Sequence, residues 1–146
     1  MAVFSVDTSC MVATVCSWHA RNRAAVAAIE SRFDRGDTLV VAAHAVLETY
    51  AVLTRLPPPH RLSGTDSWAL IKANFIDLGT VAAPSGQQYV DLVGSLPGRG
   101  VVGGRSYDAL IAASVSGSGV TELLTFNTKH FDSLNGFVAV EPAAVS

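Results

Sequence analysis

The spacing of apolar residues along the chain changes repeatedly between a pattern typical of strands and one typical of helices. Short apolar runs bounded by turn residues predict β-strands at residues 3–6, 38–42, 79–83, 120–124 and 137–140. Longer segments that are rich in helix formers or carry an apolar stripe predict helices at residues 8–16, 21–35, 43–56, 64–77, 84–96 and 105–116. Because strands and helices alternate, the sequence predicts one α/β domain over residues 1–146, with a mostly parallel central sheet.

Turn residues mark several of the predicted boundaries. The prolines at residues 57–59 end one helix, since proline lacks an amide proton and restrains the residue before it. Ser63 is placed to cap the next helix, with Asp66 at the third helical position as in a capping box. The glycine-rich residues 97–104 predict a flexible loop before the last helix.

Composition narrows the class of protein only in part. The chain has 146 residues, 49% of them hydrophobic, which is enough to bury a core without disulfides. Its net charge of −2 argues neither for nor against binding to nucleic acid. Burial in a compact core accounts for much of the mean hydropathy of +0.36, and an apolar surface that another chain covers is the other explanation.

The cysteines, the length of the longest apolar stretch and the first residues bear on where in the cell the protein is expected. Cys10 and Cys16 match neither a redox motif nor a zinc spacing, so we expect two buried, reduced thiols. The longest nearly apolar stretch, residues 39–47, is too short to span a bilayer. The first residues lack the features of a signal peptide, and a cytoplasmic location is therefore expected.

Three of the twelve acidic residues occupy positions where an acid is costly. Asp7 ends the first predicted strand, and Glu48 and Asp108 lie within largely apolar helices. The carboxyl ends of strands in a parallel sheet line the ligand crevice, which favours a site at Asp7. The other nine acids are interpreted as one helix cap and eight solvated charges. These are Asp66 as the cap, and Glu30, Asp34, Asp37, Asp77, Asp91, Glu122, Asp132 and Glu141.

A cluster of carboxylates without histidine or cysteine partners suits a hard cation such as Mg²⁺ or Mn²⁺. Such an ion lowers the pKa of a bound water, orients a phosphate and neutralises charge on a leaving oxygen. Asp7, Glu48 and Asp108 are therefore candidate residues for phosphoryl-transfer chemistry.

At this point the motifs resemble those of a known family, the PIN-domain nucleases, and within it the VapC-type toxins of bacterial toxin–antitoxin pairs. The resemblance rests on four segments in order along nearly the whole chain. They are Val6-Asp7-Thr8-Ser9, Glu48 in the third helix, Tyr107-Asp108-Ala109-Leu110-Ile111-Ala112-Ala113, and Leu124-Thr125-Phe126-Asn127-Thr128-Lys129-His130-Phe131.

The resemblance implies a three-layer fold, endonucleolytic cleavage of RNA with Mg²⁺ or Mn²⁺, a VapB-type antitoxin and a homodimer. Transfer RNA and ribosomal RNA are the typical targets of such toxins. Cleavage by activated-water attack would leave a 5′-phosphate and a 3′-hydroxyl. The resemblance makes Asp7, Glu48 and Asp108 both the catalytic residues and the metal ligands.

The resemblance also assigns residues around the three acids. Ser9 and Thr125 match the supporting hydroxyls of the site. Asn127 falls where many members carry a fourth acid, so the choice between one and two metal ions stays open. Asp132 is a possible substitute, but it follows Phe131, outside the usual position, and is interpreted as solvated.

Two arginines are further candidate site residues, and three other functions are weighed against the nuclease. Arg99 and Arg105 flank the glycine-rich loop and are candidates for contacts with RNA phosphates. A haloacid dehalogenase-type enzyme would need a second aspartate where Ser9 stands, and a receiver domain would need an acidic pair near the first strand. The alternative that stays open is a catalytically degenerate PIN-like module that binds RNA or a partner without cutting.

Overall fold

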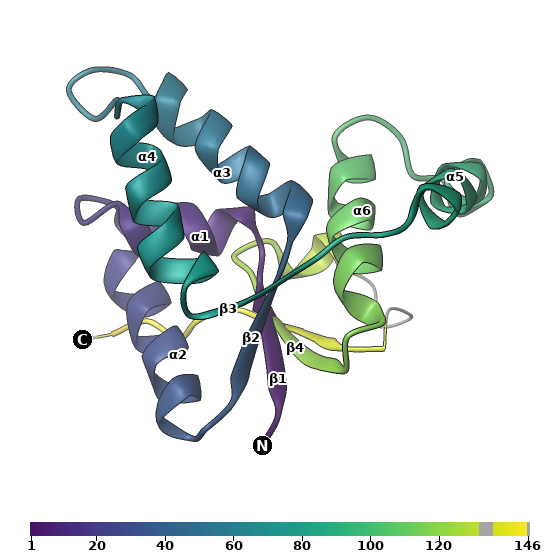
Figure 1. The fold of residues 1–146 in the computed structure, drawn as a ribbon, viewed down its shortest axis with the longest axis horizontal. Helices are drawn as coiled ribbons and strands as arrows, with labels where there is room; N and C mark the ends of the chain where they lie inside the picture. The colour runs from purple at the N-terminus through teal and green to yellow at the C-terminus, as the bar shows by residue number, and fades with distance from the viewer. Residues whose placement is uncertain (132–135, 146) are drawn as a thin grey trace.

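Five parallel strands form a single sheet in the computed structural model, which describes residues 1–131 and 136–145. The strands stand in the order β3-β2-β1-β4-β5, and every neighbouring pair is parallel (Figure 1). Their bounds are β1 Val3–Val6, β2 Thr38–Ala42, β3 Gly79–Ala82, β4 Val120–Leu124 and β5 Val138–Val140. The predicted parallel sheet is confirmed.

Helices lie on both sides of this sheet and complete three layers. In Figure 1, α1, α2 and α4 lie on one side of the strands, and α5 and α6 lie on the other. The α-helices are α1 Thr8–Val15, α2 Asn22–Asp34, α3 Ala43–Arg55, α4 Gly64–Ile71, α5 Gly86–Ser95 and α6 Arg105–Ser116. Helix α4 continues as a π-helical segment, Lys72–Ile76, which accounts for the longer helix predicted there. The three-layer α/β architecture is confirmed.

The core lies between the sheet and its two helical layers. Strands covered on both faces read as continuous apolar runs, and β1 and β2 are of this kind. Phe4, Val6, Val41 and Leu123 are fully buried. Complete burial of each such side chain contributes about 1.5–3 kcal/mol. Helix α1 adds Cys10 to this core, and both cysteines are buried free thiols, as predicted.

The helix ends differ in one detail from the prediction. The Ser63 hydroxyl accepts a hydrogen bond from the Asp66 amide, which confirms the predicted cap. The complete capping box, however, lies at α5, where the Ser85 side chain accepts from the Gln88 amide and the Gln88 side chain accepts from the Ser85 amide. The turn residues before α5 therefore define where it starts, although no residue of α5 is buried.

The acid at residue 37 corrects one interpretation. Asp37 is 7% exposed, not solvated, because its carboxylate accepts from the Ala2 amide and pairs with Arg35 at 2.6 Å. Glu122, also interpreted as solvated, pairs with Arg32 at 3.1 Å. Arg35 is two residues from Asp37 in the sequence, whereas the fold alone brings Ala2 to Asp37 and Arg32 to Glu122. Asp132 lies outside the described residues.

The order of the strands creates a switch point beside β1. The chain runs from β1 outward through β2 to β3, and then returns to place β4 on the opposite side of β1. Val6 is in register with Leu124, and the Asp7 amide donates to the Leu124 carbonyl at 3.0 Å. The segments that leave β1 and β4 therefore separate at the carboxyl edge, the place where open α/β sheets bind ligands. In the described part of the chain, no helix has the length and apolar character needed to cross a membrane.

Candidate active site

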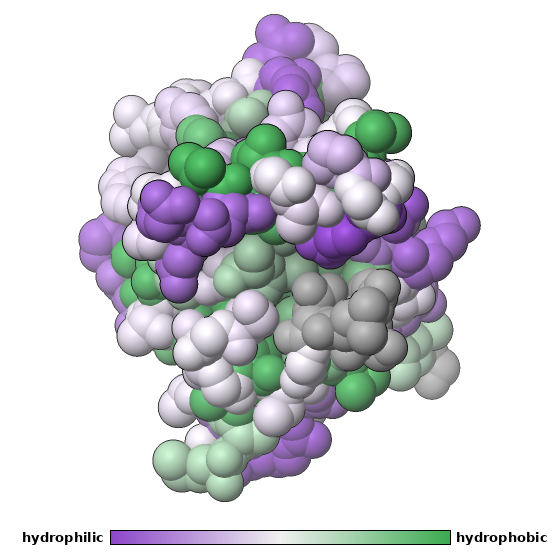
Figure 2. Space-filling model, turned by 90° about the vertical axis from the view of Figure 1, so that its right-hand side faces the viewer, coloured by the Kyte–Doolittle hydropathy of each residue, from purple (hydrophilic) through white to green (hydrophobic). Residues whose placement is uncertain are grey.

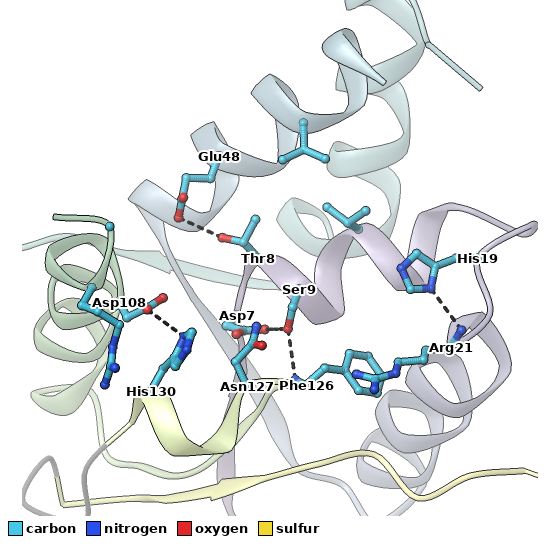
Figure 3. Close-up of a pocket in the computed structure, with 14 residues that line it drawn as sticks. Asp7, Thr8, Ser9, His19, Arg21, Glu48, Asp108, Phe126, Asn127 and His130 are labelled. Carbon is cyan, nitrogen blue, oxygen red and sulfur yellow. Dashed lines mark hydrogen bonds and ion pairs between the residues drawn. The ribbon is translucent and has the colours of Figure 1, made fainter. Parts of the chain in front are cut away.

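A cavity of about 770 Å³ opens at this carboxyl edge. Its walls come from the β1–α1 junction, helices α3 and α6, the start of α2 and the segment that follows β4. Asp7, Glu48 and Asp108 all line it, although they are far apart in the sequence (Figure 3). The fold thus brings the three predicted acids to one cavity.

Asp7 is the most buried of the three acids and is also the N-cap of α1. It is 3% exposed, and its Oδ1 accepts from the Cys10 amide at 3.0 Å. The same oxygen accepts from the Ser9 hydroxyl at 2.6 Å, while Oδ2 accepts from the Thr125 hydroxyl. Three donors from α1 and the end of β4 therefore fix the orientation of this carboxylate.

The two hydroxyls also connect Asp7 to the backbone beyond β4. Ser9 Oγ accepts from the Phe126 amide at 3.0 Å, and Thr125 Oγ1 accepts from the Asn127 amide at 2.9 Å. Each hydroxyl therefore donates to the acid and accepts from the backbone that follows β4. This network places Ser9 and Thr125 where supporting hydroxyls were predicted, and it sets the position of Asn127 at the cavity wall.

Glu48 and Asp108 face the cavity from α3 and α6. Glu48 Oε1 accepts from the Thr8 hydroxyl at 3.0 Å and lies 3.5 Å from His44 Nε2. Asp108 Oδ2 lies 3.1 Å from His130 Nδ1, and its side chain is 23% exposed. Both carboxylates therefore remain accessible from the cavity, unlike the enclosed carboxylate of Asp7.

Burial and mutual repulsion act on two of these acids. Burial raises the pKa of Asp7 above its ordinary value, against the lowering effect of its three hydrogen bonds, and the charge of Asp108 raises it further. Burial likewise raises the pKa of Asp108, with a further contribution from Glu48, while His130 opposes the shift. The cavity therefore concentrates negative charge that nearby groups only partly neutralise.

Basic and aromatic side chains also line the cavity. Arg105 lines it from the start of α6, whereas Arg99 is exposed and does not line it. Sequence reasoning missed His130, which contacts Asp108, and it missed Arg21, whose guanidinium carbon lies 4.6 Å from the centre of the Phe126 ring. No spacing in the sequence connects these residues to the acids, since they come from the turns after α1 and β4.

The side chains of the cavity include oxygen ligands of the kind that a divalent cation binds. Among residues 1–131 and 136–145, no three His, Cys, Asp or Glu side chains already lie close enough together to hold a metal ion. The chemistry of the site nevertheless fits a hard cation, because the carboxylates of Asp7, Glu48 and Asp108 all line one cavity and are the ligand type that such ions prefer.

Comparison with curated proteins identifies relatives of this chain. It is 38% identical to Ribonuclease VapC40 of Mycobacterium tuberculosis over 123 residues, which cover 82% of each protein. It is 33% identical to Ribonuclease VapC27 of the same species over 115 residues, covering 77% of this chain and 76% of the relative.

Solved structures show the same fold at lower identity. The crystal structure of M. tuberculosis VapC20, described as a Sarcin-Ricin loop cleaving toxin, matches with a TM-score of 0.73 and 21% identity over 95% of this chain and 99% of that one. VapBC2 from Rickettsia felis, bound to a DNA fragment from its promoter, matches with a TM-score of 0.66 and 14% identity. The match covers 95% of this chain and 98% of that one. The family model described as PIN domain matches residues 5–136. The chain therefore belongs to the PIN domain family.

Proposed function

We propose that this protein is a metal-dependent endoribonuclease and the toxin of a VapB–VapC-type toxin–antitoxin pair. The observation that carries the proposal is the meeting of Asp7, Glu48 and Asp108 in one cavity at the switch point of the sheet. The relatives named as VapC ribonucleases, at 38% and 33% identity, support the same activity.

In this proposal Asp7 and Asp108 hold a Mg²⁺ or Mn²⁺ ion, and Glu48 positions the attacking water and accepts its proton at a carboxylate oxygen. When bound, the ion would lower the pKa of the water and offset charge on the phosphate. Ser9 and Thr125 keep Asp7 in one orientation through their hydroxyls. In-line attack of the water oxygen on phosphorus would break the P–O3′ bond, and the departing 3′-oxygen would take a proton from solvent, leaving a 5′-phosphate and a 3′-hydroxyl.

The proposed substrate is structured RNA, either transfer RNA or ribosomal RNA. The structural neighbour VapC20 is described as a toxin that cleaves the Sarcin-Ricin loop, which supports this substrate class. Arg105 at the cavity wall is a candidate contact for a phosphate of the RNA, and exposed Arg99 is a weaker one. Asn127 supplies a neutral oxygen in place of a fourth acid, which favours one metal ion before RNA binds.

The direct test is incubation of the purified protein with total RNA and Mg²⁺ or Mn²⁺, followed by mapping of the cleaved ends. Discrete cuts that carry a 5′-phosphate, and that disappear with EDTA and in Asp7→Asn, are the expected result. Cleavage that persists in EDTA would contradict metal dependence. If the wild type binds RNA without cleaving it, the alternative of a non-cutting module is favoured. The neutral side chain of Asn127, in place of a fourth acid, supports that alternative.

A VapB-type antitoxin is the proposed protein partner. Structural neighbours include VapBC complexes from Haemophilus influenzae and Salmonella typhimurium, each with a TM-score of 0.66. Growth arrest on expression, relieved by co-expression of the adjacent small gene, is the expected result. Arrest by Asp7→Asn at the wild-type level would show that toxicity does not depend on the proposed site.

A second copy of the chain is the proposed partner of the α5 side. Tyr89, Val90 and Val93 of α5 are 47%, 63% and 52% exposed, and the helix carries only one charged residue, Asp91. Figure 2 views this side and shows hydrophobic side chains exposed among polar ones. Because α5 has a complete capping box yet leaves these three apolar side chains exposed, its apolar face is suited to pair with the same face of another copy.

A further inference from the structure

The cavity has a second end, away from the three acids, that the proposed cleavage chemistry does not use. His19 and Arg21 line this end from the turn between α1 and α2, and Phe126 lines it from the segment after β4 (Figure 3). His130 and Arg105 stand at the other end, near Asp108. Basic side chains therefore line both ends of the cavity.

Phe126 holds the Arg21 guanidinium in a defined orientation. The guanidinium carbon lies 4.6 Å from the ring centre, within the range of a cation–π contact. Within the described residues, no N–H donor of this guanidinium makes a hydrogen bond, so its donors stay available for a ligand. The backbone amide of Phe126 is bound to Ser9, which itself donates to Asp7, so the support of Arg21 is connected to the acid centre.

Arg21 has no acidic partner within the described residues. In the arginine–carboxylate pairs there, Arg32 pairs with Glu122, and Arg35 pairs with both Asp37 and Glu122. The Arg21 backbone amide, rather than its side chain, donates to His19 Nδ1 at 3.0 Å. A neutral His19 ring then carries its proton on Nε2, and both side chains can donate to a ligand in the cavity.

The groove continues past Arg21 over the surface of the protein. A neighbouring hollow of about 420 Å³ shares Arg21 and Phe126 with the first and is also lined by Arg23 and by one acid, Glu141. A strand leaving the acid centre would thus pass Arg21 first and Arg23 next. The two arginines outnumber the single acid of this hollow, which fits an extended chain that carries negative charge.

We propose that Arg21, supported by Phe126 and assisted by His19, binds a backbone phosphate of the RNA next to the scissile one. This inference rests on the proposed ribonuclease function and adds a subsite to it. The contact sets where the strand lies relative to Asp7, Glu48 and Asp108. Arg21 is a positioning residue, since it lies at the far end of the cavity from Asp108.

The test compares Arg21→Gln with Arg55→Gln, an exposed arginine of α3 outside the cavity that loses the same charge. Both changes are made in an Asp7→Asn background, so that binding of a labelled, single-stranded 12-nucleotide RNA is measured without cleavage. We expect Arg21→Gln to weaken binding about tenfold, as loss of a charged hydrogen bond does, and to reduce the salt slope by about 0.7. Arg55→Gln should change neither quantity.

The role of the aromatic ring is tested by a double-mutant cycle. Phe126→Leu keeps the apolar bulk and removes the cation–π support, so it should weaken RNA binding less than Arg21→Gln does. Added to Arg21→Gln, it should have no further effect, because its action passes through the guanidinium. In the background with Asp7 intact, Arg21→Gln should also shift the mapped cleavage positions, which a loss of stability alone would not do.

The outcomes separate this subsite from the proposed function. If the wild type cuts RNA while Arg21→Gln keeps its affinity, salt slope and cleavage positions, the subsite is overturned and the nuclease stands. If Arg21→Gln instead loses only binding to the antitoxin, Arg21 contacts a protein carboxylate and the RNA subsite is overturned. If the wild type neither binds nor cuts RNA, the proposed function and the subsite both fail.

Discussion

Asp7→Asn should make the metal-free protein more stable at neutral pH while abolishing cleavage. Burial raises the pKa of Asp7 even though the carboxylate accepts three hydrogen bonds, so the folded protein disfavours its charged form. Asparagine has nearly the same shape. Its side-chain oxygen can still accept from Ser9 and the Cys10 amide, which preserves the cap of α1.

The size of this gain in stability follows from two opposing changes, one in the hydrogen bonds to residue 7 and one in the cost of burying its charge. Hydrogen bonds to a charged group contribute about 1.5–3 kcal/mol each against about 1 kcal/mol for neutral pairs, so the substitution weakens the hydrogen bonds to Asp7. Removal of the charge recovers a desolvation penalty of several kcal/mol, and also relieves repulsion from Asp108. Because the raised pKa shows that desolvation outweighs the hydrogen bonds, the net gain is on the order of 1 kcal/mol, or roughly 4 °C in Tm.

Thermal unfolding in EDTA, followed from pH 3.5 to 8, measures this effect. A raised pKa gives the wild type stability that is present below the ordinary value of 3.8 and is lost as the pH rises through the folded value. The advantage of Asp7→Asn should therefore be near zero at the acid end and reach its plateau at neutral pH. A variant less stable than wild type at pH 7 and equal to it at pH 4 would refute the reasoning.

The same melts with Mn²⁺ test the role of Asp7 as a ligand. Saturation at 100 times Kd stabilises a protein by about 2.7 kcal/mol, and the wild type should show a rise of this order. Asp7→Asn should lose most of this rise, so the order of the two stabilities reverses when metal is added. An equal rise in both proteins would show that the ion binds elsewhere.

Three further predictions use other parts of the molecule. His130→Ala should weaken Mn²⁺ binding in calorimetry by about tenfold, because the ring contacts Asp108, and unchanged affinity would contradict that role. Val93→Asp should convert a dimer to a monomer in light scattering, whereas a wild type that is already monomeric would contradict the pairing of α5. Burial raises the pKa of the Cys10 thiol, so it should not react with a disulfide reagent at pH 8 until the protein unfolds, and rapid reaction of the native protein would contradict its enclosed position.

The helices and strands could be predicted from the sequence because the spacing of apolar residues largely decides whether a segment folds as a helix or as a strand. The strand at residues 38–42 and the helix at residues 105–116 match the structure residue for residue. The convergence of the three acids could be anticipated only from the resemblance to the PIN-domain nucleases, because Asp7 alone follows the end of a strand, whereas Glu48 and Asp108 lie within helices. The partners of the acids could not be foreseen, because His130 reaches Asp108 from a turn that no local pattern places.

Asp7 shows why the site depends on the order of the strands as well as on the acids themselves. A buried carboxylate is costly, and α1 alone can offset part of that cost through the Cys10 amide and Ser9. The remaining donor, Thr125, is 118 residues away and reaches Asp7 only because β4 returns to pair with β1. A strand order that placed β4 elsewhere would leave Oδ2 without this donor and would move Phe126 away from Ser9. The same pairing therefore stabilises the buried acid and brings Phe126, the support of Arg21, to the cavity.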